Sequence, residues 1–187
     1  MVFRPDAGCT IKFAKGVAVD KLVDHRMLLV GAPQDNWANG VYFAMGVLTD
    51  FVAVKRDEAE IVCQSLNPSK DFAGIDAKGI DTVKMGTLYA ILMGVKADPA
   101  FMSDFVCQAS EDGPWVSEVP QDMARKLAEL APTELRSIGA RWATTEEFTM
   151  EYGGWPPEAV HQVLQNLAMM CTRALSESKV VFMWMCL

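Results

Sequence analysis

The sequence lacks the short motifs that identify the common classes of enzyme. It contains no G-x-x-x-x-G-K-[ST], no G-x-G-x-x-G, no G-x-S-x-G and no H-E-x-x-H. These are the signatures of phosphate-binding loops, dinucleotide folds, serine hydrolases and zinc proteases. Only two histidines are present, His25 and His161, although histidine is the residue most often used as a general acid or base. These absences favour a non-enzymatic protein without a cofactor.

The cysteines are too widely spaced in the sequence to indicate a disulfide framework. The sequence has no C-x-x-C pair, and its five cysteines are Cys9, Cys63, Cys107, Cys171 and Cys186. An odd number without short spacings is atypical of a secreted disulfide scaffold, and a Cys/His zinc site would need ligands from distant segments. We therefore expect a protein of the reducing cytoplasm with no bound metal.

Long apolar runs and excess positive charge are missing as well. No apolar stretch approaches the roughly 20 residues that a membrane-spanning helix needs, and no continuous signal-peptide core follows Arg4. The 17 Lys and Arg residues are outnumbered by 24 Asp and Glu, which gives a net charge of −7. We therefore expect neither a nucleic-acid nor a membrane partner, whereas a basic protein would be attracted by complementary charge.

Composition divides the chain near Met45. Residues 1–44 are interrupted by glycine and proline, while the patterns that indicate secondary structure occupy residues 45–187. The first segment is interpreted either as a strand-rich element packed on the domain or, in the favoured interpretation, as a weakly ordered N-terminal extension. Residues 45–187 are then a single domain.

The patterns in this second part predict an α+β fold. Alternating or β-branched runs predict strands at 50–56, 104–110, 115–119 and 180–187, and apolar stripes predict helices at 57–66, 81–94, 121–131, 133–142 and 157–178. The last strand is apolar throughout, which is typical of a strand buried on both faces. We therefore expect a small mixed or antiparallel sheet with the C-terminal strand buried centrally, packed by four to five helices.

Residue types at the helix ends predict specific caps. Asp57, Asp81 and Thr133 are expected to be N-caps, and Gly94 a left-handed C-cap. Residues 67–79 are expected to form a loop of about thirteen residues, which is longer than most connections and therefore a candidate for function.

Three acids of this region are candidate ligands for a partner or cation: Asp71, Asp76 and Asp81. Their spacing does not match that of an EF-hand, so no metal site is predicted. Helix capping and ordinary solvation are the competing explanation for the same charges.

A second candidate set follows the helix at 133–142, and its members are Glu146, Glu147, Glu151, Tyr152 and Trp155. Aromatic residues dominate the energetics of many interfaces, so acids beside them indicate an anchor for a basic partner. In the competing interpretation, Trp142 and Trp155 close the ends of the hydrophobic core.

An enzyme is the alternative hypothesis. Its site would be built from the loops at 67–79 and 149–157, with Asp76 or Asp81 working beside Tyr152 or His161. The competing interpretation of His161 is a half-exposed helix residue at the edge of an apolar stripe.

The segment DTVKMGTLYAILMG at residues 81–94 resembles the YfbM-like family of small bacterial proteins. An acid-started helix with Leu88, Leu92 and Gly94 matches the pattern of that family, but Met85 and Tyr89 stand where it usually has Trp and His. The resemblance extends over residues 45–187 and implies the order of the later helices, a terminal apolar strand and a bacterial origin. It implies no activity.

Small acidic bacterial proteins of this kind are often encoded beside toxin genes. By that association, the resemblance suggests an immunity-type protein that masks the basic surface of a toxin. The functional hypothesis is therefore a non-enzymatic, acidic interaction protein with a basic protein partner.

Overall fold

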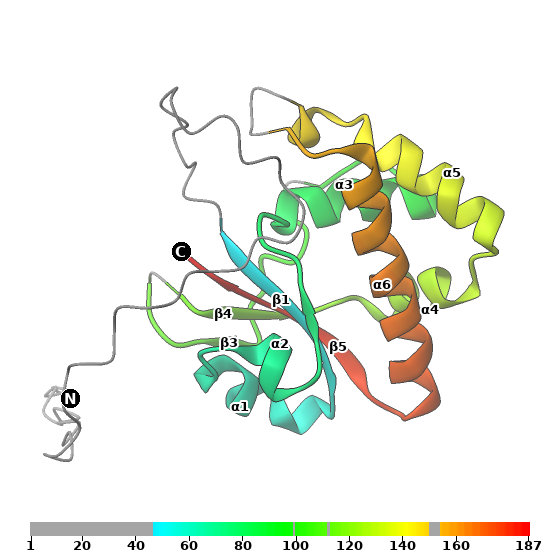
Figure 1. Ribbon diagram of the computed structural model, residues 1–187. Helices are drawn as coiled ribbons and strands as arrows, with labels where there is room; N and C mark the ends of the chain where they lie inside the picture. The colour runs from blue at the N-terminus through cyan, green and yellow to red at the C-terminus, as the bar shows by residue number, and fades with distance from the viewer. Residues whose placement is uncertain (1–46, 99, 112, 150–153) are drawn as a thin grey trace, which may run out of the picture. The chain divides into compact units, whose positions relative to one another are not determined.

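A computed structural model describes residues 47–187 with the exception of 99, 112 and 150–153 (Figure 1). The predicted N-terminal extension at 1–44 and its boundary at Met45 lie outside the described residues.

An antiparallel five-stranded sheet forms the centre of the described part, in the order β2-β1-β5-β4-β3. The strands are β1 (Leu48–Val54), β2 (Ile75–Asp76), β3 (Cys107–Gln108), β4 (Trp115–Glu118) and β5 (Val180–Cys186). The expectation of a mixed or antiparallel sheet is therefore confirmed in its antiparallel form.

The C-terminal strand β5 is the middle strand, as its sequence predicts. It pairs along its whole length with β1, from Val54 opposite Val180 to Leu48 opposite Cys186. Side chains alternate across a strand, so the β5 residues divide between two apolar clusters, one containing Met183 and the other Trp184. Burial on both faces explains why this strand carries no polar side chain.

Helices cover both faces of the sheet (Figure 1). They are α1 (Ala59–Gln64), α2 (Pro68–Asp71), α3 (Thr82–Met93), α4 (Gln121–Glu129), α5 (Pro132–Ala143) and α6 (Pro157–Ser176). Residues of α3 to α6 pack on the sheet face that holds Phe51 and Met183. Residues of α1 pack on the opposite face, against Val52 and Phe182. The predicted α+β class is therefore confirmed.

Helix α3 has the ends that its sequence predicts. The Asp81 carboxylate accepts a hydrogen bond from the Lys84 backbone N–H at 2.8 Å, and Gly94 ends the helix with a left-handed φ of 66°. Met85, Leu88 and Leu92 of the predicted stripe are buried. The two ends of α3 are therefore predicted correctly from the residues that cap them.

Two predicted N-caps are wrong. Asp57 lies inside a 3-10 turn, η1 (Arg56–Glu58), where the Lys55 N–H donates to the Glu58 carboxylate at 2.7 Å. Thr133 lies within α5, because Pro132 is the first helical residue and Ala131 is the cap. Proline suits that first position, since its missing N–H would have no helical acceptor.

The predicted loop at 67–79 is also wrong, because it contains α2 and β2. Pro68 begins α2, and the buried Asp50 of β1 accepts a hydrogen bond from the Ser69 N–H at 2.8 Å. Ile75 and Asp76 then pair with Phe51 and Asp50. Both features depend on β1, so the local sequence does not reveal them.

The predicted hairpin around residues 111–114 is confirmed, with Cys107 opposite Val116 and Gln108 opposite Trp115. Its first strand is shorter than predicted, since only Cys107 and Gln108 of the 104–110 run form β3. Most of that run is therefore irregular and lies at the edge of the sheet.

Gly139 lets α5 approach α6 closely. A Cβ at this position would lie 2.7 Å from the Nδ1 atom of His161. We expect Gly139→Ala to lower the free energy of unfolding, because a clash of this kind costs about 1–3 kcal/mol. That cost exceeds the roughly 1 kcal/mol gained from helix propensity. Chemical denaturation measures the change.

The same substitution in a His161→Ala background is the matched control. Removing the imidazole removes the clash, so Gly139→Ala should become neutral or stabilising there. Destabilisation of equal size in both backgrounds would contradict this explanation.

Candidate functional site

A pocket of about 360 Å³ lies where α3 begins and a 3-10 turn, η2 (Glu146–Phe148), passes beside it. Its lining residues are Asp81, Val83, Lys84, Glu146 and Glu147. Among the described residues, three carboxylates and one ammonium group therefore line one pocket, and the acids come from segments about 65 residues apart in the sequence.

The start of α3 places Asp81 and Lys84 together. While one oxygen of Asp81 caps the helix, the other lies 2.9 Å from the Lys84 Nζ atom. The Lys84 side chain is only 12% exposed, and its Nζ lies 5.7 Å from the centre of the Phe148 ring. The one cation among the described lining residues is therefore already held by an acid and an aromatic face.

Glu147 is tied to α3 through one carboxylate oxygen. Its Oε1 accepts a hydrogen bond from the Thr87 hydroxyl at 2.8 Å. Burial acts to raise the pKa of Glu147, but its own backbone N–H, the Thr87 and Thr145 hydroxyls and the charge of Lys84 together outweigh burial and lower the pKa. The carboxylate is therefore held in its charged form.

The other oxygen of this carboxylate is not satisfied. Glu147 Oε2 is buried and has no hydrogen-bond partner within the described part of the chain. Buried acceptors are almost always paired, because an unpaired one loses its water without compensation. Glu147 Oε2 therefore has capacity for a further donor.

Three aromatic side chains, Trp142, Phe148 and Trp155, form an aromatic wall beside the pocket. Trp142 and Phe148 meet edge to face with ring centres 5.2 Å apart, and Phe148 meets Trp155 at 5.8 Å. Trp142 also donates from Nε1 to the Lys84 carbonyl at 3.0 Å. The wall therefore joins α5 and η2 to α3, and it fixes the carboxylates relative to one another.

The structure thus brings together members of both predicted sets. Asp81 of the first set and Glu146 and Glu147 of the second line the same pocket. Trp155 is partly buried against the core and stands behind Phe148. Glu151 and Tyr152 lie outside the described residues.

The other two predicted acids lie elsewhere and make local hydrogen bonds. Asp71 accepts from the Ser65 hydroxyl at 2.6 Å, and Asp76 accepts from the Lys78 N–H at 3.2 Å. Both are exposed at the surface.

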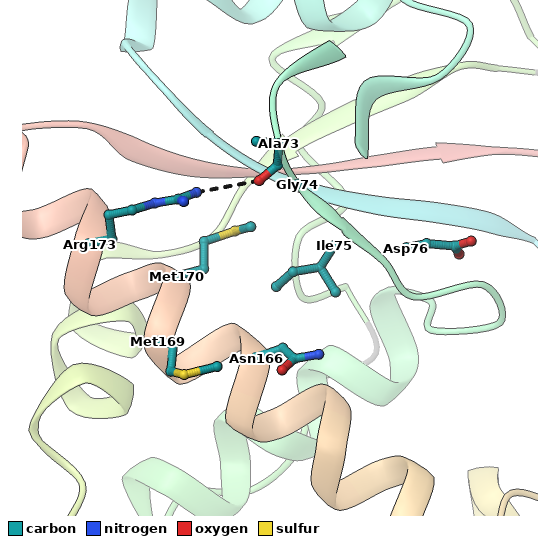
Figure 2. A pocket seen from close by; sticks show the side chains of 8 residues that line it. All are labelled: Ala73, Gly74, Ile75, Asp76, Asn166, Met169, Met170 and Arg173. Atoms are coloured by element: carbon teal, nitrogen blue, oxygen red, sulfur yellow. Dashed lines mark hydrogen bonds between the residues drawn. The ribbon is translucent and has the colours of Figure 1, made fainter. Parts of the chain in front are cut away.

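Asp76 borders a second, open groove of about 490 Å³ between residues 73–76 and α6 (Figure 2). In this view Arg173 reaches toward the Ala73 carbonyl, to which it donates at 3.5 Å, while Asp76 points away from it. Arg173 and Asp76 lie at opposite ends of the groove, and apolar side chains such as Met169 lie between them. It has no convergent set of charges comparable with that at η2.

No protein-family model and no curated protein matches this chain. Among solved structures, it is similar to YfbM from Escherichia coli, a protein of unknown function. That match covers 74% of this chain and 99% of the other, with 13% sequence identity and a TM-score of 0.40. It agrees with the resemblance expected from the sequence.

Of the residues of the alternative enzyme site, Tyr152 lies outside the described residues, and Asp76 and Asp81 border different pockets. His161 faces Gly139 between α5 and α6, where its Nδ1 atom is buried without a partner among the described residues. The loops at 67–79 and 149–157 do meet, since Trp155 lies against Gly79. The residues lining the two pockets above, however, do not include His161.

No group of three or more His, Cys, Asp or Glu side chains among the described residues is arranged to hold a metal ion. None of the helices described is long and apolar enough to cross a membrane.

Sequence reasoning missed Lys84 and Thr87. Lys84 had a local signal, because a lysine three residues after a capping aspartate lies within reach of it. Thr87 had no local signal, since its hydrogen bond to Glu147 joins residues 60 positions apart in the sequence.

Proposed function

We propose that this chain is a non-enzymatic binding protein whose acidic pocket at α3 and η2 receives a cationic side chain of a basic protein partner. The described part of the pocket lining carries three carboxylates and one ammonium group, and that ammonium group is already paired with Asp81. Its remaining negative charge belongs to Glu146 and Glu147. An arginine, with its planar set of donors, matches two such carboxylates better than a lysine does.

The observation that carries this proposal is the Glu147 oxygen that has no partner among the described residues. The Glu147 carboxylate is charged and partly buried, and within that part of the chain only its Oε1 atom has a hydrogen-bond donor. The terminal torsion of a glutamate is soft, so Oε2 can turn toward a donor that enters the pocket. An arriving guanidinium would satisfy the acceptor and neutralise the excess charge.

Long-range charge favours the same class of partner. A net charge of −7 accelerates the encounter with a basic protein and disfavours nucleic acid. A toxin with a basic surface is a partner of this chemistry, so an immunity-type role is the specific form of the proposal.

Titration with an arginine-containing peptide tests the proposal. We expect Glu147→Gln to weaken binding by roughly tenfold or more, because it removes the charge that pairs with the bound cation. Glu146→Lys should weaken it further by repulsion. Calorimetry at fixed salt measures both effects.

Two controls isolate the pocket. Glu129→Lys changes an exposed acid on α4, so it should alter affinity only slightly. A peptide with citrulline in place of arginine keeps the shape but loses the charge, and it should not bind. Equal binding of both peptides, or of the parent and Glu147→Gln, would refute the proposal.

A further inference from the structure

Two cysteines that are distant in the sequence meet beneath α1. Cys63 belongs to α1 and is 1% exposed, and Cys107 belongs to the edge strand β3 and is partly exposed. Both belong to the apolar layer on one face of the sheet, where Cys107 packs against the cluster that contains Cys63. Helix α1 itself contacts β3 and β4.

The Cys63 thiol points at the β3–β4 hairpin. Its Sγ donates a long hydrogen bond to the Pro114 carbonyl at 3.8 Å. Burial, followed by a hydrogen bond with the Cys107 side chain and the charge of that side chain, raises the pKa of Cys63 to about 12. The contact of Cys63 with the β3–β4 hairpin and the packing of Cys107 against the same cluster place the two thiols as neighbours near α1.

We propose that Cys63 and Cys107 are a thiol-modification site, at which a low-molecular-weight disulfide converts the two thiols into an internal disulfide. This bond would fasten α1 to the edge strand β3. It goes beyond the proposed binding function and does not depend on it.

The reaction has a definite order, because the two thiols differ in access. The partly exposed Cys107 attacks the disulfide as its thiolate, forms a mixed disulfide and releases one reagent thiol. Cys63 then loses its proton, attacks the Cys107 sulfur as its thiolate and closes the internal bond, while the second reagent thiolate leaves and takes up a proton. Because the pKa of Cys63 is raised, this second step is the slower one. The protein loses two hydrogen atoms overall, and one reagent disulfide becomes two thiols.

The other two described cysteines, Cys171 and Cys186, differ from each other in their position. Cys171 lies in the cluster on the other face of the sheet and is buried. Cys186 is near the end of β5 and contacts the same layer as Cys63, and its Sγ lies 3.5 Å from the Leu187 carbonyl. It is therefore the one described residue that could compete with Cys107.

The test is to treat the folded full chain with glutathione disulfide, block the remaining thiols and measure the intact mass. We expect the parent to lose two hydrogen atoms after a transient single adduct. Peptide mapping should join Cys63 to Cys107. Because the closed bond restrains a long loop, it should raise the unfolding temperature by roughly 5–10 °C, reversibly with reductant.

Single substitutions separate the two roles. Cys63→Ala should stop at the stable glutathione adduct on Cys107, whereas Cys107→Ser should give no internal bond and no adduct at Cys63. Cys171→Ser and Cys186→Ser should react as the parent does. A bond mapped to Cys186 or Cys9, or an unchanged reaction in Cys107→Ser, would overturn the proposal.

Discussion

Replacement of Trp142 by alanine is expected to lower the free energy of unfolding by about 3–5 kcal/mol. The side chain is fully buried at the junction of α5, η2 and α3, where it meets Phe148 edge to face. Its removal leaves a large cavity and also breaks the bond from Nε1 to the Lys84 carbonyl. Chemical denaturation, with the slope checked for two-state behaviour, measures the loss.

The conservative change Trp142→Phe separates packing from hydrogen bonding. It keeps most of the ring but removes the donor, so it should cost about 0.5–1.5 kcal/mol for the lost hydrogen bond in addition to the lost volume. The same variant should weaken arginine-peptide binding, because Lys84 and Phe148 are then less firmly placed. Full stability in Trp142→Ala would show that this wall does not support the core.

Replacement of Trp184 by alanine is also expected to lower the free energy of unfolding by about 3–5 kcal/mol. Trp184 lies at the middle of the central strand, between Asp50 of β1 and Val116 of β4, and is 6% exposed. The cavity would open within the layer covered by α1. A loss below about 1 kcal/mol would contradict the central position of β5.

The phenylalanine variant should behave differently here than at Trp142. The Trp184 Nε1 atom is buried without a partner among the described residues, so Trp184→Phe removes an unsatisfied donor while it loses volume. These effects oppose each other. We therefore expect Phe to cost less at position 184 than at position 142, when both are measured in the same denaturant.

The sequence predicts best those elements whose structure depends on residues close by in the chain. The ends of α3 follow from Asp81 and Gly94, and the burial of β5 follows from its uninterrupted apolar run. These signals are local and each has one physical explanation. They were enough to predict the class of the fold and the position of its central strand.

The errors occur where a distant partner decides the local structure. Residues 67–79 read as a loop because neither β2 nor the hydrogen bond from Ser69 to Asp50 exists without β1. The site shows the same limit. Composition selected Asp81, Glu146 and Glu147, but it could not show that they share one pocket, because only the packing of η2 on α3 brings them together.

The position of β5 also constrains the order in which this sheet can be completed during synthesis. On the ribosome β1 and β4 are made before the strand that pairs with both of them. Until Cys186 has emerged, each of these strands presents an open apolar edge, which is the kind of surface that associates with other chains. A nascent chain paused before residue 180 should therefore require protection by a chaperone, whereas in the finished sheet, as far as the described residues go, the edges are formed by the short strands β2 and β3.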